Sequence, residues 1–196
     1  MNCRAANRLY VRADGSVPCN CDVGENVTLY RPDLRRLERA DYVGECFNGR
    51  PFLRMREQLA GGREFLKGCK ECFFFAPEEP FDHAGDGGRV RHVEDVQVES
   101  TFLCALDCAA CVPKAIRQDP VLSPLGEGPY VLPDDVFRKL IDDLQRSGLT
   151  VGEFNFCGRG EPLLHPRFGE LVSYSRAKFP DALYSAVTGA SLRFFP

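Results

Sequence analysis

The chain has 196 residues, of which 44% are hydrophobic and 27% charged, and its formal net charge is −3 at pH 7. This apolar content predicts a folded core and excludes a disordered chain, and the slightly acidic balance argues against a nucleic-acid partner. No apolar run approaches the roughly 18 residues that would span a membrane, and the N-terminus has no apolar signal-peptide segment. We therefore expect a cytoplasmic protein with no nucleic-acid and no membrane partner.

The ten cysteines are the most unusual part of the composition. A reducing cytoplasm disfavours disulfides, and the even number of cysteines is their only support, so we interpret these residues as metal or cluster ligands. Six of them lie in the first part of the chain: Cys3, Cys19, Cys21, Cys46, Cys69 and Cys72.

This first part, residues 1–76, is predicted to begin with a β-hairpin. Residues 8–12 alternate like a strand, Asp14-Gly15 predicts a turn, and residues 16–19 would return as the second strand.

Two short helices and a linker are expected to follow. The segments 32–40 and 51–60 each carry a proline in the first turn, which favours a helix start. Residues 77–94 are rich in Pro, Gly and charged residues and predict a linker.

From residue 95 to 196 the pattern changes to an alternation of strands and helices. Apolar residues at a 3–4 spacing predict a helix over 134–146, and a second helix is expected over 168–178. Strands are predicted over 96–102, 151–156 and 182–187. This alternation predicts an α/β fold with parallel strands. Sites in such sheets lie at the carboxyl ends of the strands, where the loops 103–112 and 157–162 begin.

The first of these loops contains Cys104, Cys108 and Cys111. Three thiolates so close in the chain can converge on one face of a loop and hold an iron–sulfur cluster. Sites with four sulfurs are usually closed electron-transfer clusters or structural zinc sites, whereas three sulfurs leave one iron open to a substrate or cofactor. The spacing therefore favours chemistry at a cluster over electron storage.

Together with the segment Gly158-Arg159-Gly160-Glu161-Pro162-Leu163-Leu164-His165-Pro166, this loop resembles the radical S-adenosylmethionine (radical SAM) superfamily. The resemblance implies that the three cysteines bind a 4Fe–4S cluster whose open iron is chelated by S-adenosylmethionine. It also implies cofactor contacts from Gly158, Gly160, Glu161 and Thr188. Glu161 would supply a carboxylate for the cationic amino group, and the glycines would let the backbone come close to the ligand.

The activity implied by the resemblance is reductive cleavage of S-adenosylmethionine to methionine and a 5′-deoxyadenosyl radical, which abstracts hydrogen from a peptide, a protein or another polar substrate. An external reductant such as flavodoxin or ferredoxin would supply the electron. The implied fold is a partial TIM barrel, of which residues 95–196 would hold about three βα units. This is less than the family's full core, so the chain would be either a fragment of a longer protein or a truncated reading frame. Ala110 stands where the family has a large residue near the adenine, which is expected to weaken cofactor binding.

Residues 1–76 are similar to the SPASM and twitch domains, small cysteine-rich α+β modules that usually follow a radical SAM core. The likeness rests on Cys3 and the segments 14–19, 47–56 and 68–72. It implies an auxiliary 4Fe–4S cluster held by Cys3, Cys19, Cys69 and Cys72, with Cys21 as the alternate to Cys19. Zinc is the alternative metal, because four thiolates satisfy it equally well.

Two other interpretations of the chain stay open. It could be a truncated, catalytically inactive iron–sulfur or zinc-binding protein that acts as a binding module, or a plain zinc-binding protein in which the glycine loop is coincidental. Three further residues are expected to be structural: Cys46 and Cys157 in the interior, and His165 at the start of a helix.

Overall fold

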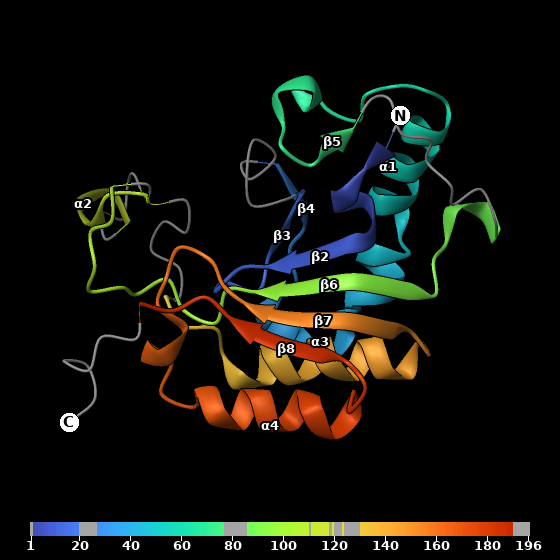
Figure 1. Cartoon of the computed structure of the whole chain (residues 1–196). Helices are drawn as coiled ribbons and strands as arrows, with labels where there is room; N and C mark the ends of the chain where they lie inside the picture. Colours follow the sequence, from blue (N-terminus) through green and yellow to red (C-terminus); the bar gives the residue numbers. More distant parts are fainter. Residues whose placement is uncertain are drawn as a thin grey trace.

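The computed structural model describes residues 2–19, 27–76, 86–109, 111–117, 119, 123 and 130–189. At its centre is a four-stranded sheet in the order β2-β6-β7-β8 (Figure 1). The strands are β2 (Arg8–Val11), β6 (His92–Val98), β7 (Thr150–Phe156) and β8 (Leu183–Ala186). All of their pairings are parallel, so the prediction of an α/β fold with parallel strands is confirmed.

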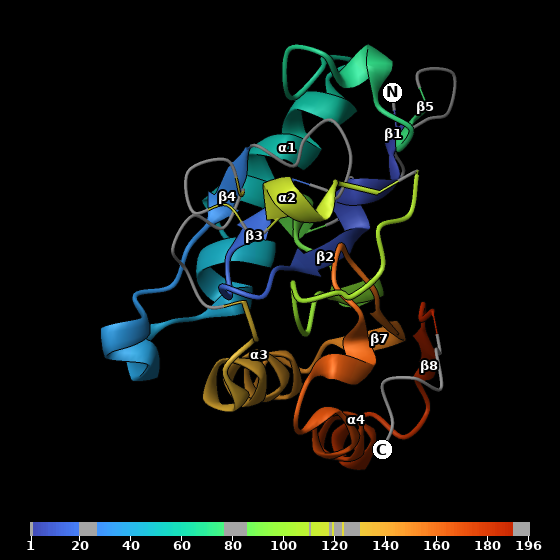
Figure 2. The ribbon, with the colours of Figure 1, turned by 90° about the vertical axis from the view of Figure 1, so that its left-hand side faces the viewer.

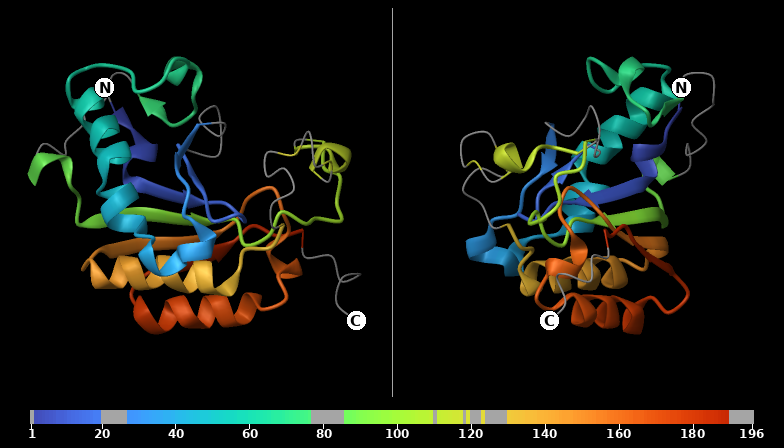
Figure 3. Two further views of the ribbon diagram at one scale, coloured as in Figure 1. Left: turned by 180° about the vertical axis from the view of Figure 1, so that it is seen from behind. Right: turned by 60° about the vertical axis from the view of Figure 1, so that its left-hand side comes forward.

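Helices cover one face of this sheet. α3 (Asp134–Arg146) follows β6 and α4 (Phe168–Lys178) follows β7, over the residues that the sequence predicts. Seen from the carboxyl ends of the strands, α3 and α4 lie on the same side of the sheet (Figure 2). α1 (Arg50–Ala60) lies near the β2 end of the sheet and packs into the same core through Phe52 (Figure 3).

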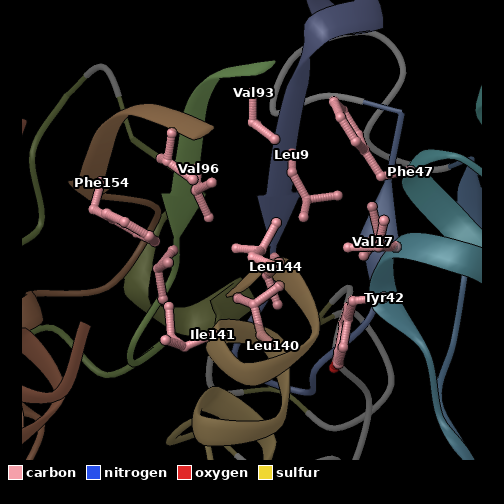
Figure 4. Close-up of a cluster of buried hydrophobic side chains, with 14 of the residues drawn as sticks. Leu9, Val17, Tyr42, Phe47, Val93, Val96, Leu140, Ile141, Leu144 and Phe154 are labelled. Carbon is pink, nitrogen blue, oxygen red and sulfur yellow. The ribbon is translucent and has the colours of Figure 1, made fainter. Parts of the chain in front are cut away.

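One large hydrophobic cluster joins the two parts of the chain. Leu9 on β2 and Val96 on β6 lie on the side of the sheet that faces Leu144 of α3 (Figure 4). Other members come from both sides of the predicted linker: Val17, Tyr42, Phe47, Phe137, Leu140, Ile141 and Phe154. Residues 1–76 therefore contribute a strand to the sheet and apolar side chains to the core that residues 95–196 build.

The predicted hairpin over residues 8–19 is wrong in its pairing. β2 pairs with β6, and the returning segment β3 (Val17–Pro18) pairs antiparallel with β4 (Thr28–Tyr30). The turn itself is present, with Gly15 at φ 75°. β2 joins the larger sheet because its two apolar core side chains are fully buried there, which an isolated two-stranded hairpin cannot achieve.

Two other predicted ranges need correction. Residues 32–40 form only a short 3-10 segment, η3 (Leu34–Arg39), because none of its side chains is buried and no packing supports a longer helix. β6 begins at His92, inside the predicted linker, and ends before the predicted strand end. Residues 77–85 of that linker lie outside the described residues.

Short elements complete the described chain. β1 (Asn2–Cys3) pairs antiparallel with β5 (Phe75–Ala76). The short helical segments are η1 (Arg4–Asn7), η4 (Tyr42–Phe47), η5 (Cys69–Glu71), η6 (Asp86–Gly88), α2 (Lys114–Arg117) and η7 (Pro162–Leu164). None of the helices within the described ranges has the length and hydrophobicity that crossing a bilayer requires.

Candidate functional site

Three loops meet beyond the carboxyl ends of β6, β7 and β8, which point to the left in Figure 1. They are the cysteine loop 103–112, the glycine loop 157–162 and the turn 187–189. Glu161 joins all three, because its N–H donates to Leu103 O at 2.7 Å and its carboxylate accepts from Gly189 N at 2.7 Å. The loops that the sequence places at the ends of separate strands therefore form one site.

The carboxylate of Glu161 is buried, with only 6% of the residue exposed. It accepts hydrogen bonds from Thr188 Oγ1 at 2.6 Å, Gly189 N at 2.7 Å and Leu163 N at 3.2 Å. A carboxylate offers about four lone-pair sites, so these donors leave room for one more. Two of the residues predicted to contact the cofactor, Glu161 and Thr188, are thus in direct contact with each other.

The glycines of the loop are required by the packing of the chain against itself. A Cβ atom on Gly160 would lie 1.8 Å from Thr101 O, and one on Gly158 would lie 2.6 Å from Glu99 Cγ. Neither glycine has a positive φ, so the close approach, and not an unusual backbone conformation, excludes a side chain at these positions. The atoms that come close belong to the segment that follows β6.

The three cysteines of the first loop carry free thiols. Cys108 is exposed, and Cys104 and Cys111 are half-buried. A tight turn links two of them, since Cys111 N donates to Cys108 O at 3.0 Å. Residue 110 lies outside the described residues, so the expected effect of Ala110 stays a prediction.

Arg117, which the sequence did not single out, ties the cysteine loop to the glycine loop. Its side chain is buried, and its guanidinium donates to Leu106 O at 2.7 Å and to Arg159 O at 3.0 Å. A guanidinium that bridges two backbone carbonyls holds the two loops at a fixed separation. No pattern in the sequence around residue 117 indicates this role.

Glu99 is a second residue that sequence reasoning missed. It is 2% exposed at the end of β6 and accepts hydrogen bonds from Tyr10 OH at 3.0 Å, Arg159 N at 3.0 Å and Ala13 N at 3.4 Å. Burial raises the pKa of Glu99, and these hydrogen bonds counteract the rise. The glycine loop is therefore attached to the N-terminal part of the chain. The signal available in the sequence was that Glu99 is the one acidic residue in the predicted strand 96–102.

A second site lies among the N-terminal elements. Cys3, Cys19, Cys69 and Cys72, which come from three separate segments, line one cavity with a volume of about 50 Å³. The rest of its wall is mainly apolar: Val27, Met55, Leu59, Phe65, Leu66 and Phe75. Cys21, the alternate ligand, lies outside the described residues. The structure thus brings together the four cysteines predicted for an auxiliary site.

The thiols of this cavity influence one another. Burial, and then the thiols of Cys3, Cys69 and Cys72, raise the pKa of Cys19 to about 12. Burial likewise raises the pKa of Cys3 to about 11. Leu66 N points at Cys69 Sγ at 3.2 Å, and hydrogen bonds to sulfur are a feature that tunes iron–sulfur sites.

Within the described ranges, no three Cys, His, Asp or Glu side chains converge closely enough to hold one metal ion. The four thiols therefore line one cavity without forming a ready-made set of ligands for a single metal ion.

The remaining cysteine and histidine predictions concern structural residues. Cys46 is fully buried in the large core, as predicted. His165 is buried, with Nδ1 accepting from Arg167 N at 3.1 Å, so Nε2 carries the proton and donates to Leu132 O at 3.0 Å. Both ring nitrogens are used by the backbone, which confirms that His165 is structural. Cys157, predicted to lie in the interior, is instead half-buried directly after β7.

Comparison of the chain with protein-family models, with curated proteins and with solved structures found no match. The function is therefore inferred from the residues and the contacts described above.

Proposed function

We propose that this chain is a radical SAM iron–sulfur protein that modifies a peptide, a protein or another polar substrate. The supporting observation is the direct contact between the two sequence motifs and the turn after β8. Glu161 donates to Leu103 at the start of the cysteine loop, and its carboxylate accepts from the turn at Thr188 and Gly189. A metal-binding loop alone would not need these two partners.

In this proposal Cys104, Cys108 and Cys111 hold a 4Fe–4S cluster with one open iron. S-adenosylmethionine bound at such a cluster supplies, on one-electron reduction, a radical that abstracts hydrogen from a substrate. The chain itself contributes orientation. The unused lone-pair site of Glu161 accepts one hydrogen bond from an amino group, Thr188 keeps the carboxylate in place, and Gly160 holds the loop against the end of β6.

The cavity lined by Cys3, Cys19, Cys69 and Cys72 would hold the auxiliary 4Fe–4S cluster. Its apolar wall keeps water from the thiolates, and four protein ligands leave no iron open. Zinc is the alternative metal at this site, because four thiolates satisfy it equally well. Such a site would pass electrons or hold substrate, and the open-iron site would carry the chemistry.

The proposal includes three further elements. The parallel sheet would be one portion of a partial TIM barrel, the protein would work in the reducing cytoplasm where its thiols stay free, and a flavodoxin or ferredoxin would deliver the electron.

Anaerobic reconstitution with iron and sulfide tests the proposal. We expect about eight irons per chain for two clusters, and formation of 5′-deoxyadenosine when S-adenosylmethionine and dithionite are added. Cys104→Ala should abolish 5′-deoxyadenosine and remove about four irons. The matched control Cys46→Ala changes a cysteine of the core. It should still form 5′-deoxyadenosine and still bind about eight irons. Cleavage that survives in Cys104→Ala would show that the cluster assignment is wrong.

A metal-binding module without radical chemistry is the second candidate. It is favoured by the difference in exposure between the two cysteine sites, because Cys3, Cys19 and Cys72 are buried whereas Cys108 is exposed. In that case reconstitution should load about four irons, or zinc in their place, with no response to S-adenosylmethionine.

A further inference from the structure

The face of the sheet opposite α3 and α4 is lined mainly by polar side chains. The strand registers align these side chains in two rows that cross all four strands. The first row is Arg8, Asp95, Glu153 and Leu183, and the second is Tyr10, Gln97, Asn155 and Ser185. Two contacts within the rows show that these side chains share one face: Arg8 pairs with Asp95, and Ser185 donates to Glu153.

This face carries an excess of negative charge. Asp95 and Glu153 stand opposite each other on β6 and β7, where like charges repel. Arg8 is the cation of the two rows, and it is shared, with Nη1 3.6 Å from Asp95 Oδ2 and Nε 3.8 Å from Glu94 Oε2. The pKa of Asp95 is raised to about 6, mainly by burial and also by Glu153 and Glu94, while Arg8 acts in the opposite direction.

Two buried acceptors on this face lack a donor. Asp95 is only 8% exposed, and its Oδ1 has no hydrogen-bond partner among the residues that the structure describes. Asn155 on the neighbouring strand is half-buried, but its Oδ1 atom is buried and also has no hydrogen-bond partner among the described residues. Buried acceptors are almost always paired in folded proteins. Arg8 lies beside Asp95 without donating a hydrogen bond to Oδ1: its own Nε is also without a hydrogen-bond partner among the described residues, and its guanidinium lies 5.6 Å from the ring centre of Phe74.

We propose that this face binds a guanidinium group of the substrate, with Asp95 and Glu153 as its carboxylate partners and Asn155 Oδ1 as a further acceptor. As a statement about the substrate class, the inference rests on the proposed function.

A guanidinium suits these acceptors better than an ammonium group does. The acceptors belong to two adjacent strands and two successive rows, so one compact charge cannot reach all of them. A planar guanidinium carries five N–H donors in a fixed fork and is less strongly hydrated than an ammonium group.

Calorimetric titration of the purified chain with N-acetyl-argininamide tests the inference. The neutral isostere N-acetyl-citrullinamide should bind about tenfold more weakly or not at all, because charge-assisted hydrogen bonds are lost. Asp95→Asn and Glu153→Gln should each weaken argininamide binding about fivefold or more. Asp181→Asn, the same charge change at an exposed position between α4 and β8, should leave it unchanged.

Three results would overturn the inference: equal affinity for the citrulline analogue, unchanged affinity in both acidic variants, or tighter binding of N-acetyl-lysinamide. Glu153 is only half-buried, so its variant serves if Asp95→Asn does not fold. The titration needs neither S-adenosylmethionine nor a loaded cluster. Absent binding with intact cofactor cleavage would therefore contradict this inference alone, and binding without cleavage would contradict the proposed function alone.

Discussion

At the scale of single residues, Glu99 has the most consequential environment. It is a buried acid that joins the end of β6, the tip of the first turn and the glycine loop through Tyr10, Ala13 and Arg159. The same carboxylate makes glycine necessary at position 158. One side chain thus sets the position of a predicted cofactor loop without being part of either motif.

We expect Glu99→Gln to lower the free energy of unfolding at pH 7 by about 1–3 kcal/mol. The amide of glutamine has one accepting oxygen in place of two, so at least one of the donors that the carboxylate now accepts from is left buried without a partner. Glu94→Gln on the exposed side of the same strand should change it by less than about 0.5 kcal/mol. Urea unfolding monitored by circular dichroism measures both. Equal effects of the two variants would contradict the role given to Glu99.

The pH dependence of the same variant follows from the direction of the pKa shift. The folded-state pKa of Glu99 lies above its ordinary value of 4.5. The folded state therefore binds the proton of Glu99 more tightly than the unfolded state does. The stability that this tighter proton binding contributes is lost as pH rises above 4.5 through the folded-state pKa. Glu99→Gln should remove that decline from the pH profile of unfolding.

At the scale of elements, the contact between α3 and η4 depends on one buried charge. Asp143 is fully buried on the apolar side of α3, where it accepts from Tyr42 N at 2.9 Å and pairs with Lys139 at 2.5 Å and with Arg146. The helical periodicity of residues 134–146 predicts the helix but not this polar residue inside its packed face.

Asp143→Ala should lower the free energy of unfolding by about 2–4 kcal/mol, since it leaves the N–H of Tyr42 buried without an acceptor and Lys139 without its counterion. The adjacent variant Asp142→Ala loses a surface pair with Lys178 and should cost less than about 1 kcal/mol. Chemical denaturation of both variants measures the difference. A larger loss in Asp142→Ala would contradict the assignment.

At the scale of the whole molecule, the two predicted parts of the chain share one sheet. β2 belongs to residues 1–76, yet it pairs with β6, and its Leu9 is fully buried in the core that α3 covers. The four-cysteine cavity and the three-loop site are therefore attached to a common scaffold, and we expect them to unfold together.

Leu9→Ala should destabilise the chain by about 2–5 kcal/mol, because it opens a cavity in the shared core. Hydrogen exchange should show an equal loss of protection in α1 and in β7. Leu183→Ala changes a leucine of β8 that is 71% exposed, and it should stay within about 0.5 kcal/mol of the parent chain. Loss of protection confined to α1 would mean that the parts unfold independently.

The sequence by itself determined the local features of this protein. The apolar spacing over 134–146 and the pattern over 168–178 located both helices of the parallel unit, and strand–helix alternation predicted that two motif loops would leave from the same edge of the sheet. These features depend on neighbours along the chain, where periodicity and turn chemistry are informative.

Only the tertiary structure decided which distant segments meet. It assigned β2 to β6 instead of to a hairpin, bonded Tyr10 to Glu99 across 89 positions, and placed Asp95 opposite Glu153. It also showed the four cysteines around one cavity, which the sequence supported only by resemblance. Such contacts follow from burying apolar side chains of remote segments in a common core, and no local pattern encodes the partner of a strand.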